Sequence, residues 1–254
     1  DITQPNFQRL PIAIPDFKYQ TPAQTQLANQ MALMLGNDLD YSGIFRPLDS
    51  RGFLQNPQEI GMTLNDINFV EWRRFGAEFL VRGAYQIQGT SLKLEMRLFD
   101  VVANRMIIGK VYEGQVQDWP AMIHRFADEI LFALTGERGV FGTKIAFVQV
   151  QGRQKEIYVV DFDGTNPVPV TRDNSLALSP SWSSDGTKLA YVSYKDKGPK
   201  IFITNLADGS QRLLIGSAGL NISPAWRPNS QELAVTLSKD GNPDIYLVSA
   251  SGSI

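Results

Sequence analysis

A short stretch that occurs three times decides the fold of the second half of this chain: TKIAFV at residues 143–148, TKLAYV at 187–192 and QELAVT at 231–236. Each copy begins 44 residues after the one before it. A second apolar run keeps the same spacing, with copies at 157–160, 201–204 and 245–248. Repeats of about 40–45 residues built from short strands are typical of β-propeller blades. We therefore predict an all-β propeller region over residues 143–254, with about two and a half blades.

Two of the repeat units are preceded by a tryptophan segment, SPSW at 179–182 and SPAW at 223–226, again 44 residues apart. An indole ring is large enough to fill the space between neighbouring sheets. The first unit has no such segment, because the position 44 residues before Trp182 is Arg138. In a closed propeller the missing inner strand would come from the far C-terminus, so we expect the natural protein to be longer than 254 residues.

Residues 1–136 carry a different pattern, which mixes the helical and the strand period. Apolar residues recur at four-residue spacing in 24–39, after Thr21-Pro22, and this predicts an amphipathic helix with proline in its first turn. A shorter helix is predicted at 69–75 and a last one at about 119–134. Strands are predicted at 79–87, 92–101 and 106–112, as an antiparallel meander. We predict an α/β domain at 1–136, with helices on a small mixed sheet, and a linker at 137–142.

Composition excludes several classes of function. The chain has 24 Lys and Arg against 26 Asp and Glu, a formal charge of −2, so no basic excess is available to neutralise a phosphate backbone and we expect no nucleic-acid partner. It has no cysteine, which removes disulfides and zinc–thiolate sites. No apolar run approaches the ~20 residues that span a bilayer, so we expect no direct membrane span.

The sequence contains no recognisable catalytic or metal-binding motif. His124 is the only histidine, so a catalytic triad or a histidine metal cluster cannot be assembled, and we expect His124 on the solvent face of the last helix. The segment 161–166 (DFDGTN) looks like a calcium loop, but its Asp-Gly pair recurs at 208–209, which favours a hairpin turn. No Gly-x-Ser-x-Gly motif occurs. We expect no enzyme activity, no cofactor and no metal.

The segment WSSDGTKLAY at 182–191 resembles the repeat of TolB-like and tricorn-like propellers. The first half narrows the choice, because its segments at 9–17 (RLPIAIPDF), 45–49 (FRPLD) and 134–141 (LTGERGVF) are similar to the corresponding segments of the TolB family. The resemblance covers the whole chain and keeps the domain order. It implies a periplasmic, non-catalytic interaction scaffold of the Tol-Pal system, with a role in outer-membrane integrity and cell division.

The resemblance also implies partners and a complete architecture. A Pal-like lipoprotein would bind the propeller and a TolA-like protein the extreme N-terminus, and the full-length protein would be a monomer. Six blades are implied, so that roughly 150–170 residues would follow Ile254. By this resemblance we expect the 254 residues to hold less than half of the propeller, and we expect a further strand to precede Asp1 in the family's architecture.

The partner-facing residues are expected on the propeller rim that precedes each tryptophan strand. For the Pal-like partner these are Leu178, Ser179, Asn221, Ile222 and Ser223; the alternative is that they form ordinary inter-blade loops. For the TolA-like partner the N-terminal remnant is Asp1, Ile2, Thr3 and Gln4. Two other functions stay open, the propeller part of a prolyl-oligopeptidase-like or tricorn-like peptidase without its catalytic domain and a carbohydrate-binding propeller.

Overall fold

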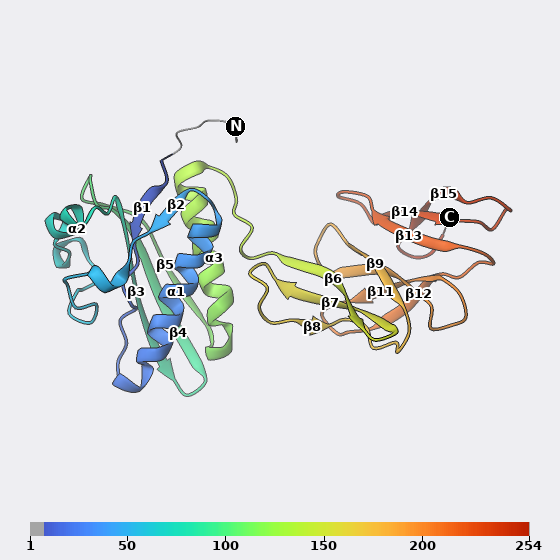
Figure 1. The fold of residues 1–254 in the computed structure, drawn as a ribbon, viewed down its shortest axis with the longest axis horizontal. Helices are drawn as coiled ribbons and strands as arrows, with labels where there is room; N and C mark the ends of the chain where they lie inside the picture. Colours follow the sequence, from blue (N-terminus) through green and yellow to red (C-terminus); the bar gives the residue numbers. More distant parts are fainter. Residues whose placement is uncertain (1–7, 254) are drawn as a thin grey trace. The chain divides into compact units, whose positions relative to one another are not determined.

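The structure is a computed structural model that describes residues 8–253. The chain divides into two compact units, with the division after Gly142. Figure 1 shows the first unit, blue to green, as helices with a sheet, and the second, yellow to red, as strands alone. The expected N-terminal remnant Asp1–Gln4 lies outside the described residues.

The first unit contains five strands and three α-helices in its described part. They are β1 (Leu10–Ala13), α1 (Thr25–Tyr41), β2 (Phe45–Pro47), α2 (Phe69–Phe75), β3 (Phe79–Gln88), β4 (Ser91–Asp100), β5 (Arg105–Gln115) and α3 (Trp119–Thr135). The three predicted helices and three predicted strands are each found within a few residues of their expected limits. Pro22 opens a 3-10 turn, Pro22–Gln24, that leads directly into α1.

The five strands form one mixed sheet in the order β2-β1-β3-β4-β5. Strands β3, β4 and β5 are the predicted antiparallel meander. The parallel edge was not predicted in detail: β1 pairs in parallel with β2 on one side and with β3 on the other. A parallel pair needs a crossover connection, and α1 is the crossover between β1 and β2.

Helices α1 and α3 lie together on one face of this sheet (Figure 1). The spacing that predicted α1 works as expected, since Met31, Leu35 and Leu39 are fully buried. From α3, Phe126 and Ile130 are also fully buried. Each such side chain contributes about 1.5–3 kcal/mol through removal of its apolar surface from water. Amphipathic packing therefore accounts for this layer.

A buried arginine supports the segment on the opposite side of the sheet. Arg82 of β3 is fully buried, and its guanidinium donates to the backbone carbonyls of Pro57 (2.7 Å) and Ile60 (2.9 Å). Burial lowers the pKa of Arg82 to about 10. The guanidinium holds the irregular chain before α2 against the sheet, a role that strand periodicity does not predict.

The second unit consists of strands in its described part. They are β6 (Lys144–Gln151), β7 (Gln154–Asp161), β8 (Val168–Pro169), β9 (Ala177–Trp182), β10 (Lys188–Ser193), β11 (Lys200–Asn205), β12 (Gln211–Ile215), β13 (Asn221–Trp226), β14 (Glu232–Leu237) and β15 (Asp244–Ser249). They form three antiparallel sheets, in the orders β6-β7-β8, β12-β11-β10-β9 and β13-β14-β15.

The 44-residue period is reproduced in the strand register. Ala146 pairs with Val159, and the pairs one and two periods later are Ala190 with Ile203 and Ala234 with Leu247. The tryptophan segments form β9 and β13, each at one edge of its sheet. The repeat therefore corresponds to repeated β-sheets, whereas the number of blades in a closed ring stays a prediction.

Candidate protein-binding rim

The rim expected from the sequence is built on two β-bulges. In β9, Ser181 pairs with Ala190 and Leu178 with Val192, so Ser179 and Pro180 together oppose one residue of β10. Strand β13 repeats this one period later, where Ser223 and Pro224 together oppose one residue of β14. A bulge bends its strand and changes the direction in which its side chains point.

Both serines at these bulges have a backbone conformation that is unusual for their residue type. Ser179 has φ 54° and Ser223 has φ 55°. Positive φ is uncommon for residues other than glycine, and it costs on the order of 1–3 kcal/mol unless the surrounding structure holds it. The residue before a proline normally takes extended backbone, so the cost is not relieved locally. The neighbouring strands impose this conformation twice, at equivalent positions.

The five expected rim residues differ in how accessible they are. Ser179 and Ser223 are exposed, and Leu178 and Ile222 are half-buried. Asn221 is 1% exposed, and its side chain is used within the protein. Its amide donates to the carbonyls of Ser217 (2.8 Å) and Pro199 (3.1 Å). Asn221 therefore shapes the loop before β13 instead of offering a surface, in contrast to the sequence-based expectation.

The two bulged strands are neighbours within the second unit. The backbone N–H of Trp226 in β13 donates to Ser181 Oγ in β9 (3.2 Å). Farther along, Ser184 Oγ accepts from the backbone N–H of Asn229 (2.9 Å) and donates to the carbonyl of Arg227 (3.2 Å). These serine hydroxyls connect one sheet to the next, so the two bulges belong to one continuous surface.

Strand register shows which turns share this surface. Ala177, at the start of β9, pairs with Ser193 at the end of β10, and Ser193 pairs with Lys200 at the start of β11. The β10–β11 hairpin therefore lies at the same end of the sheet as Ser179. The β11–β12 turn, with Asp208 and Gly209, lies at the opposite end.

The expectation for His124 is wrong. It is 3% exposed, and its Nδ1 lies 2.8 Å from Asp38 Oδ2 of α1, which is 1% exposed. The side chain is part of the contact between α1 and α3, not of a solvent-facing surface. Its polar neighbours in the sequence suggested exposure, but a carboxylate on another helix supplies the partner that burial requires.

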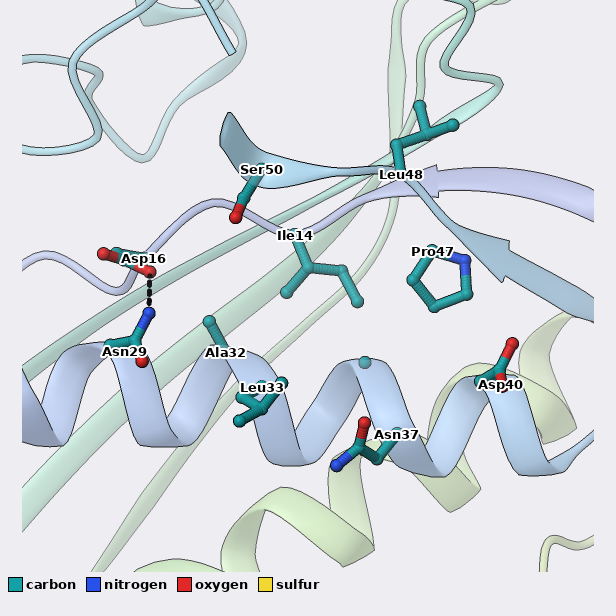
Figure 2. A pocket seen from close by; sticks show the side chains of 11 residues that line it. Ile14, Asp16, Asn29, Ala32, Leu33, Asn37, Asp40, Pro47, Leu48 and Ser50 are labelled. Atoms are coloured by element: carbon teal, nitrogen blue, oxygen red, sulfur yellow. Dashed lines mark hydrogen bonds between the residues drawn. The ribbon is translucent and has the colours of Figure 1, made fainter. Parts of the chain in front are cut away.

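The first unit also has a pocket beside α1. It has a volume of about 320 Å³ and lies between α1 and the β1–β2 edge. Figure 2 shows Asp16 and Asp40 at opposite ends of it, with Asn29 donating to Asp16 Oδ1 (3.2 Å). Across residues 8–253, no group of three or more His, Cys, Asp or Glu side chains could hold a metal ion. No helix in the same range is long and apolar enough to cross a membrane.

Both halves of the chain match models of known protein families. Residues 1–107 match the family model described as the TolB amino-terminal domain, and residues 132–254 match the TolB β-propeller domain. The chain belongs to the TolB family. The second unit is thus the TolB propeller region, and the predicted resemblance is confirmed in both halves.

Relatives of the TolB family are similar over most of this chain. The Tol-Pal system protein TolB of Desulfosudis oleivorans is 41% identical over 72% of the chain and 42% of its own length. That of Syntrophotalea carbinolica is 38% identical over 62% of the chain and 36% of its length. The crystal structure of TolB from Acinetobacter baumannii matches 96% of the chain and 59% of its own chain, with a TM-score of 0.81 and 27% identity. The chain therefore spans less than half the length of these two curated relatives.

Proposed function

We propose that this chain is part of a non-catalytic, periplasmic protein-binding scaffold of the Tol-Pal system, which contributes to outer-membrane integrity and cell division. Its propeller rim binds a Pal-like lipoprotein, and Asp1–Gln4 belong to the segment that binds a TolA-like protein. The names of the relatives as Tol-Pal system proteins support this assignment.

The observation that carries the proposed rim is the pair of bulges at Ser179 and Ser223. Both serines are exposed and both have positive φ. Backbone strain of this kind is concentrated at ligand-binding surfaces, where the scaffold holds it. Their small side chains let another protein approach the backbone closely, and the half-buried Leu178 and Ile222 beside them add apolar surface.

Substitution at the rim tests the proposal. Ser179→Arg and Ser223→Arg in the intact protein each place a long cation where a partner would pack. We expect the affinity for the Pal-like lipoprotein, measured by calorimetry, to fall at least about tenfold, which corresponds to ~1.4 kcal/mol. The matched control is Ser210→Arg, an exposed serine at the opposite end of the same sheet. Equal weakening by Ser210→Arg, or full affinity in both rim variants, contradicts the rim assignment.

The N-terminal assignment is tested separately. Removal of Asp1–Gln4 is expected to weaken binding of the TolA-like protein while binding of the Pal-like lipoprotein stays within about twofold. Unchanged TolA binding after this removal means that the segment lies elsewhere.

A further inference from the structure

The end of the second unit that carries Ser179 is more basic than the rest of the chain. Three segments meet at this end of the first two sheets: the β6–β7 turn with its flanks (151–156), the loop before β9 (170–176) and the β10–β11 turn with its flanks (193–200). They hold six Lys and Arg residues against three Asp and Glu, in a chain whose formal charge is −2. We call them the basic rim segments.

The opposite end of the same two sheets does not share this excess. The strand start at 143–144 and the turns at 161–167, 183–188 and 205–211 hold two lysines against four aspartates. The third sheet is not basic either, since its β14–β15 turn at 238–244 holds one lysine and two aspartates. The excess of positive charge is therefore local to one end of the first two sheets.

Hydrogen bonds and an ion pair hold the three segments side by side. The backbone N–H of Lys155 donates to the carbonyl of Ser175 (2.9 Å). The ammonium of Lys195 lies 3.1 Å from the carboxylate of Asp173. The loop 170–176 is thus joined to β7 on one side and to the β10–β11 turn on the other, so the basic rim segments form one surface.

A buried carboxylate fixes the loop that presents part of this charge. Glu156 is 6% exposed. Its carboxylate accepts from the Thr171 hydroxyl and from the backbone N–H of Asn174 (2.8 Å). Arg172 lies between these two anchored residues and is itself exposed. Its backbone is therefore held in place before a partner arrives, which lowers the conformational cost of binding at this position.

The acids of the basic rim segments do not cancel their positive charge. Each segment presents one exposed cation, and these are Arg153, Arg172 and Lys197. Glu156 and Asp173 make the internal contacts described above. Asp196, the remaining acid, lies 4.0 Å from the ammonium of Lys200. With all three acids counted as charged, the six cations still leave the surface positive.

We propose that the basic rim segments bind an acidic surface of the protein partner that docks on the rim, and that they select this partner by charge. The proposal rests on the rim assigned under the proposed function and adds the chemistry of the partner's face. A positive surface attracts the Asp and Glu side chains of an approaching protein, accelerates its association and disfavours a basic face. The exposed Arg153 and Arg172 can each form bidentate hydrogen bonds with a carboxylate.

Charge reversal tests the proposal, with stopped-flow and calorimetric measurement of binding to the soluble domain of the Pal-like lipoprotein. In Arg172→Glu/Lys197→Glu we expect the association rate and the affinity to fall at least about tenfold at ~50 mM salt. At ~500 mM salt, screening is expected to reduce the difference to within about threefold. The control Arg46→Glu/Arg74→Glu reverses two exposed arginines of the first unit, changes the net charge equally and is expected to stay within about twofold of the parent.

Ser223→Arg separates this proposal from the rim assignment, because Ser223 lies in the third sheet, outside the basic rim segments. Weaker binding in Ser223→Arg, together with parent-like binding in the charge-reversal variant, overturns the acidic partner face and leaves the rim assigned. Weaker binding in the charge-reversal variant alone supports the acidic face and contradicts only the position given to Ser223. Equal loss in the Arg46→Glu/Arg74→Glu control overturns selection by this surface, and a parent protein that does not bind overturns both proposals.

Discussion

The ammonium of Lys195 lies 4.2 Å from the centroid of the Phe202 ring. One period later Lys239 lies 4.7 Å from the Tyr246 ring. The 44-residue repeat therefore reproduces a cation–π contact across the hairpin, in addition to the strands themselves. Lys195 also pairs with the carboxylate of Asp173 (3.1 Å), which is largely buried.

Replacement of Lys195 by methionine is expected to lower the free energy of unfolding of the second unit by about 1–2 kcal/mol. The methionine keeps the apolar stem but removes the charge from the Phe202 ring and from Asp173. Urea denaturation measures the change. Arg153→Ala, at an exposed position, is expected to stay within ~0.5 kcal/mol of the parent protein. A Lys195→Met variant as stable as the Arg153→Ala control means that the contact contributes nothing.

Loss of the buried pair between α1 and α3 is expected to be more costly. His124→Ala removes a buried hydrogen-bond partner of the Asp38 carboxylate and leaves a cavity in the α1–α3 contact, and together these losses are expected to cost about 2–5 kcal/mol. Urea denaturation of the first unit, followed by circular dichroism at helical wavelengths, measures it. A loss below ~1 kcal/mol would falsify the assignment of His124 as a buried structural residue.

The Asp185 turn is expected to give the second unit an acid-dependent stability. Ser183 Oγ donates to Asp185 Oδ1 (2.6 Å), and Thr187 donates to the same oxygen from its backbone N–H (3.0 Å) and its hydroxyl (2.7 Å). These hydrogen bonds, that of the Ser183 side chain first, lower the pKa of Asp185 to about 2. Since the folded pKa is lower than the unfolded one, the contribution is present above pH ~4 and is lost as the pH falls through about 2.

NMR titration of the Asp185 carboxyl carbon checks this directly. We expect a midpoint near pH 2 in the parent protein and a higher one in Ser183→Ala, which lacks the largest cause of the shift. Asp185→Asn is expected to remove the corresponding part of the pH dependence of the urea midpoint. An Asp185 midpoint at the usual value near pH ~4 contradicts the role of these hydrogen bonds.

The Asp128 carboxylate of α3 holds the segment that follows this helix. Asp128 Oδ1 accepts from the backbone N–H of Phe141 (2.9 Å), and Oδ2 accepts from that of Gly142 (3.0 Å). A Cβ on Gly139 would lie 2.0 Å from Asp128 Oδ1 and 3.0 Å from the Asp128 backbone. The linker therefore needs an acceptor at position 128 and no side chain at position 139.

Hydrogen exchange tests this linker contact. In Asp128→Ala the amides of Phe141 and Gly142 lose their acceptors, and we expect their exchange to accelerate at least about tenfold. Gly139→Ala is expected to have the same effect through steric displacement of the carboxylate. Glu129→Ala, at the adjacent helix position, is the control. Exchange that is unchanged in Asp128→Ala shows that something else protects these amides.

The sequence alone was sufficient for the features that depend on local pattern. The 44-residue repeat predicted the strands of the second unit, the four-residue apolar spacing predicted α1, and alternating runs predicted the meander β3–β5. These patterns are visible in the sequence because the residues on the buried face recur about every 3.6 residues in a helix and every second residue in a strand. The propeller region could be inferred in this way, whereas the family followed from the resemblance of segments such as 9–17 and 45–49.

Tertiary structure decided the features that depend on a distant partner. His124 is buried because Asp38, 86 residues away in sequence, supplies its hydrogen-bond partner. Ser179 takes a positive φ because the strand beside it has one residue fewer across the bulge, which no single-strand pattern reveals. The parallel pairing of β1 likewise depends on where α1 returns the chain. The local period of a sequence does not show which distant group is the hydrogen-bond partner of a buried polar atom, or which strand pairs with the edge of a sheet. Only the contacts of the folded chain determine these partners.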